Sequence, residues 1–323
     1  MAIVSKNIDL AVELLCLNQA VAIPTETVYG LAGNALNEDA VNKIYSVKNR
    51  PKSNPLIVHV KALSETYKYV KNISELSLKI AEQLWPGPLT ILFDKSEKIP
   101  DFVTSGLKKV AIRVPRHPQT LELLNTLNFP LAAPSANPFS YISPTNPLHI
   151  QKQIGSKIPM ILDGGACQEG LESTIIGVEN DEVIVYRTGI ISTDEIEKIV
   201  GKKVVFHRAH LSQVVALGML PYHYSPNTKL YLFNDLSEIN EIRDENISII
   251  TFSQLDKKFK NLTVLSTQGV LKEAAQKFYD TLFVVDSSGY DAIYCQLFPE
   301  KGLGITLNEK LRKAAKKHDN KKR

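Results

Sequence analysis

Four cationic side chains stand at positions where an isolated charge is costly or unexpected. Lys48 and Arg50 lie in "VKNRP", where Pro51 indicates that a preceding helix ends and the cations project from a loop. Arg113 and Arg187 each end an apolar run, "VAIR" and "VIVYR". Because burial of an unpaired guanidinium is very costly, each must meet a carboxylate, a carbonyl or a ligand anion. Taken singly, a solvated basic turn or a structural ion pair would explain each of them.

Small polar side chains follow or interrupt several other apolar runs. They are Thr25 in "AIPT", His59 in "LIVHV", Ser135, Asn137 and Ser143 in "APSANPFSYISPT", and Ser173 in "LESTI". Glycines and small polar residues at strand ends let backbone amides approach an anion closely. If these strand ends meet, the pocket has several cations and hydroxyls and almost no free carboxylate, which suits a polyanion such as ATP. The chain has neither a Walker A sequence nor a protein-kinase signature, so an ATP site here has another design.

The elements that would position these residues form an α/β domain over residues 1–206. Short runs rich in branched side chains alternate with helical patterns, which predicts a twisted, mixed sheet with helices. We expect helices at 5–20, 38–48, 64–84, 117–126 and 192–200, and strands at 20–23, 55–60, 89–93, 110–115, 130–135, 160–163, 173–178 and 183–187.

The rest of the chain predicts a linker and a second, smaller domain. Residues 207–228 carry His, Tyr and Pro in irregular order, which indicates a connector. Residues 229–323 predict a Rossmann-like α/β unit with a parallel sheet, although no GxGxxG fingerprint follows its first strand. Its expected strands are 229–233, 247–252, 262–267, 281–288 and 292–297, and its expected helices are 235–243, 270–280 and 307–317.

Length, composition and charge bound the class of protein. At 323 residues the chain exceeds the usual size of one core, and 44% apolar with 22% charged residues is ordinary for a globular protein. No run approaches the length of a membrane span, and three scattered cysteines fit a reducing cytoplasm. The segment 310–323 holds eight Lys or Arg and one Asp, so its net charge of +7 exceeds the +4 of the whole chain. It is either a solvated helix end or a weak attractor for RNA phosphates.

Read in order, these motifs resemble those of a known family. "PTETVYGL", "KNRP" before "NPLIVHV", "WPGPLT", "AIRVP", "APSAN" before "SPT", and "DGG" before "ESTI" are similar to the YrdC-type threonylcarbamoyl-AMP synthases over about residues 10–206. "YHYSPNT" and the second unit resemble the long, two-domain form. The resemblance implies a YrdC-like fold and a reaction in which L-threonine, bicarbonate or CO2, and ATP with Mg²⁺ give threonylcarbamoyl-AMP and pyrophosphate.

The resemblance also implies partners and roles for single residues. The product would pass to downstream threonylcarbamoyl-transferase proteins that modify an adenosine next to the anticodon of tRNA (t6A), and direct contact with tRNA is a further expectation. The expected threonine-binding residues are Thr25, His59, Arg113 and Ser173. The expected ATP-binding residues are Lys48, Arg50, Asn54, Ser135, Asn137, Ser143 and Arg187, covered by Tyr222 and His223 of the linker. No resident metal site and no single general base are assigned, since a carbamate is already an anion.

Two other functions stay open at this stage. An RNA-binding module would use the same cations to grip a double-stranded or tRNA backbone, with steep salt dependence and no need for ATP. A carbamoyl-transfer domain of the kind used in hydrogenase maturation is the other, and the "YHYSP" linker disfavours it. Hydroxyls at Thr25, Ser135, Ser143 and Ser173, which phosphate binding alone does not demand, favour the enzyme.

Overall fold

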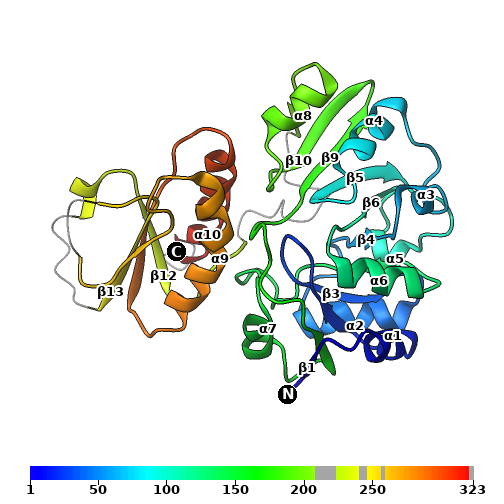
Figure 1. Ribbon diagram of the computed structural model, residues 1–323, viewed down its shortest axis with the longest axis horizontal. Helices are drawn as coiled ribbons and strands as arrows, with labels where there is room; N and C mark the ends of the chain where they lie inside the picture. Colours follow the sequence, from blue (N-terminus) through cyan, green and yellow to red (C-terminus); the bar gives the residue numbers. More distant parts are fainter. Residues whose placement is uncertain (208–222, 240–245, 256–258, 320–323) are drawn as a thin grey trace.

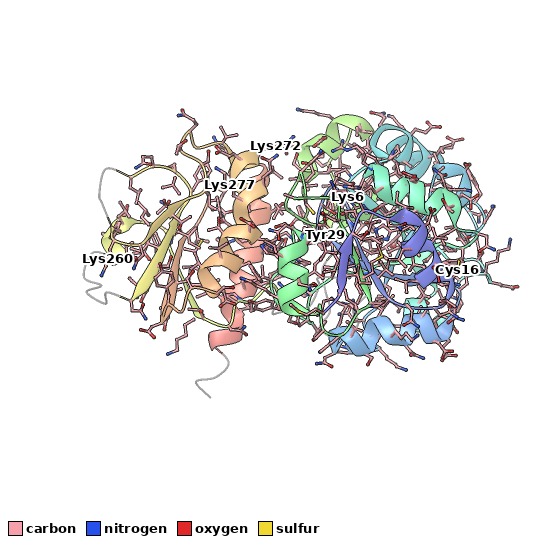
Figure 2. The ribbon with its side chains drawn as sticks, turned by 60° about the horizontal axis from the view of Figure 1, so that its bottom comes forward. Lys6, Cys16, Tyr29, Lys260, Lys272 and Lys277 are labelled. Atoms are coloured by element: carbon pink, nitrogen blue, oxygen red, sulfur yellow. The ribbon has the colours of Figure 1, made fainter. Side chains whose placement is uncertain are left out.

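The computed structural model describes residues 1–207, 223–239, 246–255 and 259–319, which form two α/β domains (Figure 1). Each domain has its own sheet, and a pair of helices of the smaller domain lies between that domain's sheet and the larger domain. Among the described residues, no helix is long and apolar enough to cross a membrane. The cysteines carry free thiols, with Cys16 exposed at the periphery of the larger domain and Cys295 buried (Figure 2).

The larger domain is built on a mixed sheet, as its alternating pattern predicts. Within the described residues it has eleven strands, in the order β1 (Ile3–Ser5), β8 (Met160–Leu162), β2 (Val21–Ile23), β3 (Gly30–Asn34), β7 (Leu131–Ala132), β4 (Ile57–His59), β6 (Lys109–Arg113), β5 (Leu89–Asp94), β9 (Thr174–Glu179), β10 (Glu182–Arg187) and β11 (Val205–Phe206). The parallel pairing of β4 with β6 sets His59 opposite Arg113 at the ends of both strands. A further bridge joins Gly30 to Ser135. Strand ends far apart in the sequence therefore meet at one place.

The helices of the larger domain are α1 (Ile8–Cys16), α2 (Glu38–Lys48), α3 (Leu63–Thr66), α4 (Glu75–Leu84), α5 (Asp101–Thr104), α6 (Pro118–Thr126), α7 (Pro147–Gln153) and α8 (Thr193–Val200). Helix α2 begins at the Asn37 cap, whose side chain accepts a hydrogen bond from the Ala40 amide, and it ends at Lys48. Asn49 then adopts a left-handed conformation with φ of 52°, which turns the chain toward Pro51. Lys48, at the end of the helix, and Arg50, just after this turn, are both buried.

Several predicted boundaries in this domain are wrong. The helix expected at 5–20 is shorter and follows strand β1, and the helix expected at 64–84 is split into α3 and α4. Strand β3 was not predicted, because its sequence "GLAGN" lacks β-branched and aromatic side chains. Its glycines serve packing instead: a Cβ on Gly30 would lie 3.2 Å from the Ala133 Cβ. Glycine is therefore found in this strand because the neighbouring segment of the chain lies too close for a larger side chain.

The smaller domain has a four-stranded parallel sheet within the described residues, in the order β12 (Lys229–Phe233), β15 (Ala292–Gln296), β13 (Ile247–Thr251) and β14 (Leu262–Val264). Its helices are η1 (Leu236–Ile239), α9 (Leu271–Asp286) and α10 (Leu303–Asp319). The strand predicted at 281–288 is wrong, because α9 continues through "TLFVVD". Leu282, Phe283 and Val285 are buried while Val284 is 54% exposed, so one face of a continuing helix is packed.

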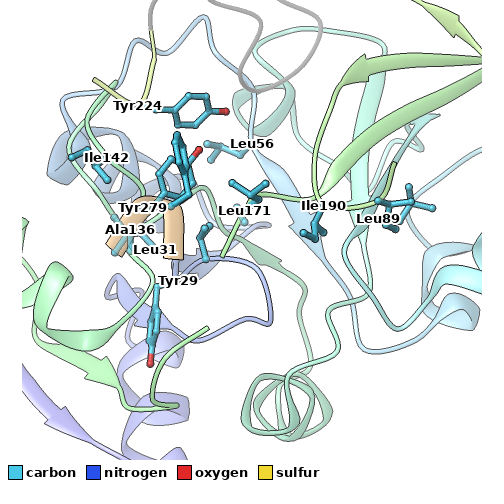
Figure 3. Packing of buried hydrophobic residues seen from close by; sticks show 14 of the residues in the cluster. Tyr29, Leu31, Leu56, Leu89, Ala136, Ile142, Leu171, Ile190, Tyr224 and Tyr279 are labelled. Atoms are coloured by element: carbon cyan, nitrogen blue, oxygen red, sulfur yellow. The ribbon is translucent and has the colours of Figure 1, made fainter. Parts of the chain in front are cut away.

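One apolar cluster runs through both domains. It includes Leu171 and Ile190 of the larger domain together with Phe278 and Tyr279 of α9. Figure 3 shows Tyr279 beside Tyr224, and the centroids of these two rings are 5.6 Å apart. The second domain is therefore part of the packing around the strand ends.

Candidate active site

The converging strand ends line one pocket. Among the described residues, Tyr29, Glu172 and Tyr224 line it together with seven of the residues that the sequence predicted for the site. Those seven are Thr25, His59, Arg113, Ser135, Ser173, Arg187 and His223. The volume of this pocket that the centre of a water molecule can reach is about 40 Å³. His223 and Tyr224 of the linker stand in its wall, so this part of the linker lies over the strand ends.

Lys48 and Arg50 stand behind the pocket and are 2% and 6% exposed. Lys48 Nζ donates to the backbone carbonyl oxygens of Ser135 and Asn137, at 2.5 Å each. Burial, together with the nearby charge of Arg50, holds the pKa of Lys48 well below its usual value. Through its two hydrogen bonds Lys48 fixes the "SAN" turn.

Arg50 is held by its own loop. Its guanidinium donates to the Asn54 side-chain oxygen at 2.6 Å and to the Pro55 carbonyl oxygen at 3.0 Å. Burial lowers the pKa of Arg50 to about 10, and the charge of Arg187 acts in the same direction. The predicted ATP-binding cations are therefore close enough to repel one another. A buried cluster of this kind attracts an anion.

Arg187 and Ser173 hold each other in place. The Arg187 guanidinium donates to the Ser173 carbonyl oxygen at 2.8 Å and to its hydroxyl at 2.9 Å. The Ser173 hydroxyl also lies 2.8 Å from the Thr90 hydroxyl. A residue predicted for ATP and a residue predicted for threonine thus share one hydrogen-bond network.

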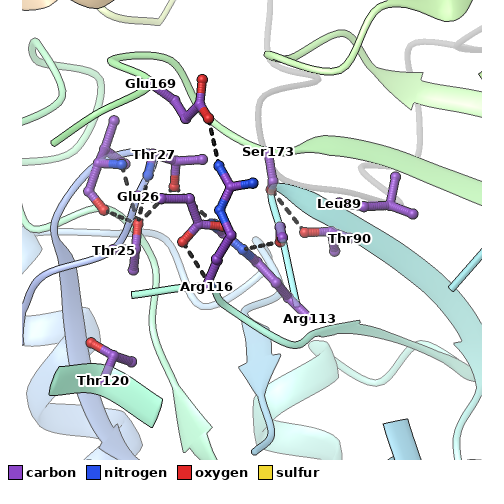
Figure 4. A network of polar contacts seen from close by, with 12 residues as sticks. Thr25, Glu26, Thr27, Leu89, Thr90, Arg113, Arg116, Thr120, Glu169 and Ser173 are labelled. Carbon is purple, nitrogen blue, oxygen red and sulfur yellow. Dashed lines mark hydrogen bonds and ion pairs between the residues drawn. The ribbon is translucent and has the colours of Figure 1, made fainter. Parts of the chain in front are cut away.

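Arg113 is the centre of a second network, drawn in Figure 4. It pairs with Glu26 at 2.7 Å and donates to the Thr27 hydroxyl at 2.9 Å. Burial raises the pKa of Glu26, but the charge and hydrogen bond of Arg113 outweigh it and leave the pKa below its usual value. Glu26 was not singled out from the sequence; the need of a buried arginine for a carboxylate was the signal that pointed to such a partner.

The same network orders the wall on the threonine side. Thr25 Oγ1 donates to the Val28 carbonyl oxygen at 2.6 Å and lies 2.7 Å from Thr27 Oγ1. An arginine has five N–H donors, and the structure gives partners to three of those of Arg113: Glu26, Thr27 and, at 3.4 Å, the Gly87 carbonyl oxygen. Arg113 thus retains donors that a ligand carboxylate can use.

His59 and His223 are neutral imidazoles in the pocket wall. Burial lowers the pKa of His59 to about 3, with a contribution from the charge of Arg113. Burial also holds the pKa of His223 well below its usual value. Within the described part of the chain, the Nδ1 atoms of both rings are buried without a hydrogen-bond partner. Each can therefore accept or donate a hydrogen bond to a ligand.

Aromatic contacts connect the linker end to the cations. The Phe139 and His223 ring centroids are 6.2 Å apart, and the Arg50 guanidinium lies 5.7 Å from the Phe139 ring. Tyr222, predicted to share the covering role, lies outside the described residues. His223 therefore stands over the side of the pocket where the predicted ATP-binding cations gather.

The described residues form no cluster of three or more His, Cys, Asp or Glu side chains that would hold a metal ion. The two buried carboxylates near the pocket, Glu26 and Glu172, are already paired with Arg113 and Lys310.

Comparison with known proteins identifies the family of this chain. The model of the Sua5/YciO/YrdC family, described as "telomere recombination", matches residues 13–189, and that of the threonylcarbamoyl-AMP synthase C-terminal domain matches residues 191–316. The threonylcarbamoyl-AMP synthase of Pyrococcus abyssi is 35% identical over 96% of this chain and 94% of its own. This chain belongs to the Sua5/YrdC family of threonylcarbamoyl-AMP synthases.

Other members of the family support the full-length match. The threonylcarbamoyl-AMP synthase of Bacillus subtilis is 34% identical over 94% of this chain and 92% of its own. The crystal structure of P. abyssi Sua5 complexed with L-threonine has a TM-score of 0.90 at 32% identity and covers 98% of both chains. The two-domain arrangement of this chain is thus that of a Sua5-type synthase.

The sequence missed part of the site because the missing residues come from elsewhere in the chain. Glu172 precedes Ser173 in the "ESTI" motif, and its partners Lys310 and Tyr279 lie on α10 and α9. Lys310 was counted in a solvated basic tail, and that interpretation is wrong for this residue, which is 2% exposed.

Proposed function

We propose that this chain joins L-threonine, bicarbonate or CO2, and MgATP into threonylcarbamoyl-AMP and pyrophosphate, as a nucleotidyltransferase. The observation that carries the proposal is one pocket in which buried cations, hydroxyls and two neutral histidines meet at the strand ends of the Sua5/YrdC domain. No other described feature combines these groups.

The chemistry needs charge neutralisation and alignment more than it needs a base. The threonine amine captures CO2 as a carbamate and releases a proton. A carbamate oxygen then forms a bond to the α-phosphorus of ATP, and the bond from that phosphorus to the bridging oxygen of pyrophosphate breaks. Buried cations act strongly on the phosphates because water is excluded, and fixed partners remove the cost of reorganisation. MgATP would bring its own metal ion.

We assign the two sides of the pocket to the two substrates. Arg187 lines the pocket and faces the triphosphate, Lys48 and Arg50 act on it from behind the pocket wall, and His223 covers it. Arg113 offers its remaining donors to the threonine carboxylate. Thr25 and His59 face the amino acid and the carbamate. Because His223 and Tyr224 line the pocket, we expect the end of the linker that carries them to move when ATP enters.

Burial of the cations disfavours an RNA-gripping module. Lys48, Arg50, Arg113 and Arg187 are 2–7% exposed, so the backbone of a folded RNA cannot reach them. The product would serve the t6A modification of tRNA through downstream transferases, and a direct contact of this chain with tRNA is a separate proposal. The free thiols are consistent with a cytoplasmic reaction.

The test is formation of threonylcarbamoyl-AMP by the purified full-length chain. Pyrophosphate release and product mass are followed with ATP, threonine, bicarbonate and magnesium, and each substrate is left out in turn. We expect product only with all of them. Pyrophosphate release that ignores threonine, or no threonylcarbamoyl-AMP from folded protein, would refute the proposal.

A further inference from the structure

The carboxylate of Glu172 joins the two domains at the wall of the active site. One of its oxygens accepts a hydrogen bond of 2.6 Å from Ser143 Oγ. The other accepts a bond of 2.8 Å from the Tyr279 hydroxyl and lies 2.8 Å from Lys310 Nζ. Because Tyr279 and Lys310 come from α9 and α10, the smaller domain supplies part of the support for a pocket residue that directly precedes Ser173.

Lys310 also supports the segment that closes the pocket. Its Nζ lies 4.5 Å from the centroid of the Tyr224 ring, and Tyr224 lines the pocket. Tyr224 has φ of 64°, a left-handed conformation that a tyrosine keeps only when its surroundings fix it. One buried ammonium thus contacts both Glu172, beside Ser173, and Tyr224 of the linker.

The burial of this ion pair argues for a role beyond stability. The side chains of Lys310 and Glu172 are 2% and 7% exposed. Apolar residues of similar volume often stabilise a fold as well as a buried ion pair does, because both charges lose their hydration. Two buried charges at the pocket wall therefore indicate that the site needs the carboxylate of Glu172 in its ionised form.

We infer that Lys310 is a positioning residue of the active site, which keeps Glu172 ionised and oriented and thereby places the Ser143 hydroxyl and the Ser173 loop. Its effect on catalysis rests on the proposed function. The charged and titratable groups that face Glu172 are Lys310 on α10, Arg187 on β10, Tyr279 on α9, and His223 and Tyr224 in the linker.

Removing the ammonium should change how the site responds to pH. Burial raises the pKa of Glu172, but Lys310 first and then Arg187, with hydrogen bonds from Lys310 and Ser143, bring it down to about 2. In Lys310→Met, only Arg187 and the Ser143 hydrogen bond oppose the effect of burial, so the pKa of Glu172 rises toward the range of the assay. A protonated Glu172 cannot accept from Ser143 and Tyr279 as the carboxylate does. The variant should therefore lose activity as the pH falls.

The experiment compares pH profiles of pyrophosphate release in four full-length proteins: wild type, Lys310→Met, Lys310→Arg and Arg312→Met. Arg312 is the matched control, because it lies on the same helix and its ion pair with Glu300 is exposed. From about pH 8 to about pH 5.5 we expect kcat/KM of Lys310→Met to fall at least about tenfold further than that of wild type. Lys310→Arg should keep the wild-type profile, and so should Arg312→Met.

The double variant Glu172→Gln/Lys310→Met removes the titrating group and should lose the added pH dependence. Because it leaves no unpaired charge buried, it can be measured even if the single variant folds poorly. Parallel profiles for Lys310→Met and wild type, or an equal effect of Arg312→Met, would overturn the inference.

A second readout separates this inference from the proposed function. If wild type makes no product, the proposed function fails, and thermal melting still tests the coupling. An unpaired carboxylate destabilises the fold only when ionised. The melting temperature of Lys310→Met should therefore drop further below that of wild type as the pH rises from about 4.5 to about 7.5. A constant difference over that range would overturn the coupling.

Discussion

Replacing Arg113 by methionine should destabilise the larger domain strongly, because it leaves a charge behind. The side chains of Arg113 and Glu26 are 5% and 2% exposed. Removing one partner of such a buried pair costs about 3–5 kcal/mol. Glu26 keeps one hydrogen bond of 3.0 Å, from the Arg116 amide, so we expect the lower end, about 3 kcal/mol. That is a large part of the roughly 5–15 kcal/mol that stabilises a typical domain.

The assay is urea unfolding followed by the fluorescence of Trp85. It is the only tryptophan in the sequence, and it is buried in the larger domain at the end of α4, just before β5, the strand that pairs with the one that carries Arg113. The double variant Glu26→Gln/Arg113→Met removes both charges and should recover about 2 kcal/mol of the loss. A single variant within about 1 kcal/mol of wild type, or no recovery in the double variant, would refute the reasoning.

The pH dependence of this loss has a definite sign. In wild type the pKa of Glu26 is lowered, so the pair stabilises the fold above the usual carboxyl pKa and this contribution is lost as the pH falls through the folded value. In Arg113→Met, burial raises the pKa of Glu26 instead. The loss should therefore be full near pH 7.5 and smaller near about pH 5. An equal loss at both values would contradict this account.

Three further variants test other parts of the site. Lys48→Met removes the donor to the Ser135 and Asn137 carbonyl oxygens, and we expect kcat/KM for ATP to fall at least about tenfold in steady-state kinetics while the melting curve stays cooperative. Ser173→Ala should raise the threonine KM about tenfold and the ATP KM less; equal effects would contradict the division of the pocket. Gly170→Ala should separate the domains and reduce activity, because Gly170 has φ of 73° and a Cβ there would lie 2.6 Å from backbone atoms of α9. Limited proteolysis should then release the smaller domain, and an unchanged digestion pattern would argue against the close packing.

The local pattern of the sequence was sufficient for most elements and for the polarity of the pocket. Strands such as 183–187 and helices such as 38–48 follow from short-range periodicity, because a buried face must be apolar whatever it packs against. An arginine at the end of an apolar run already requires an acceptor. The sequence did not distinguish a buried helix from a buried strand over 281–288, because a short apolar run with branched side chains is compatible with either element.

What the sequence by itself determined is the kind of site: cations and hydroxyls at strand ends, held by two α/β units, in an order similar to one family. Only the tertiary structure decided the partners. Glu26 for Arg113 lies 87 positions away, and Lys310 reaches Glu172 from the other domain. Neither pairing follows from local spacing, because an ion pair depends on distance in space and on exclusion of water, and both are set by how sheets and domains pack.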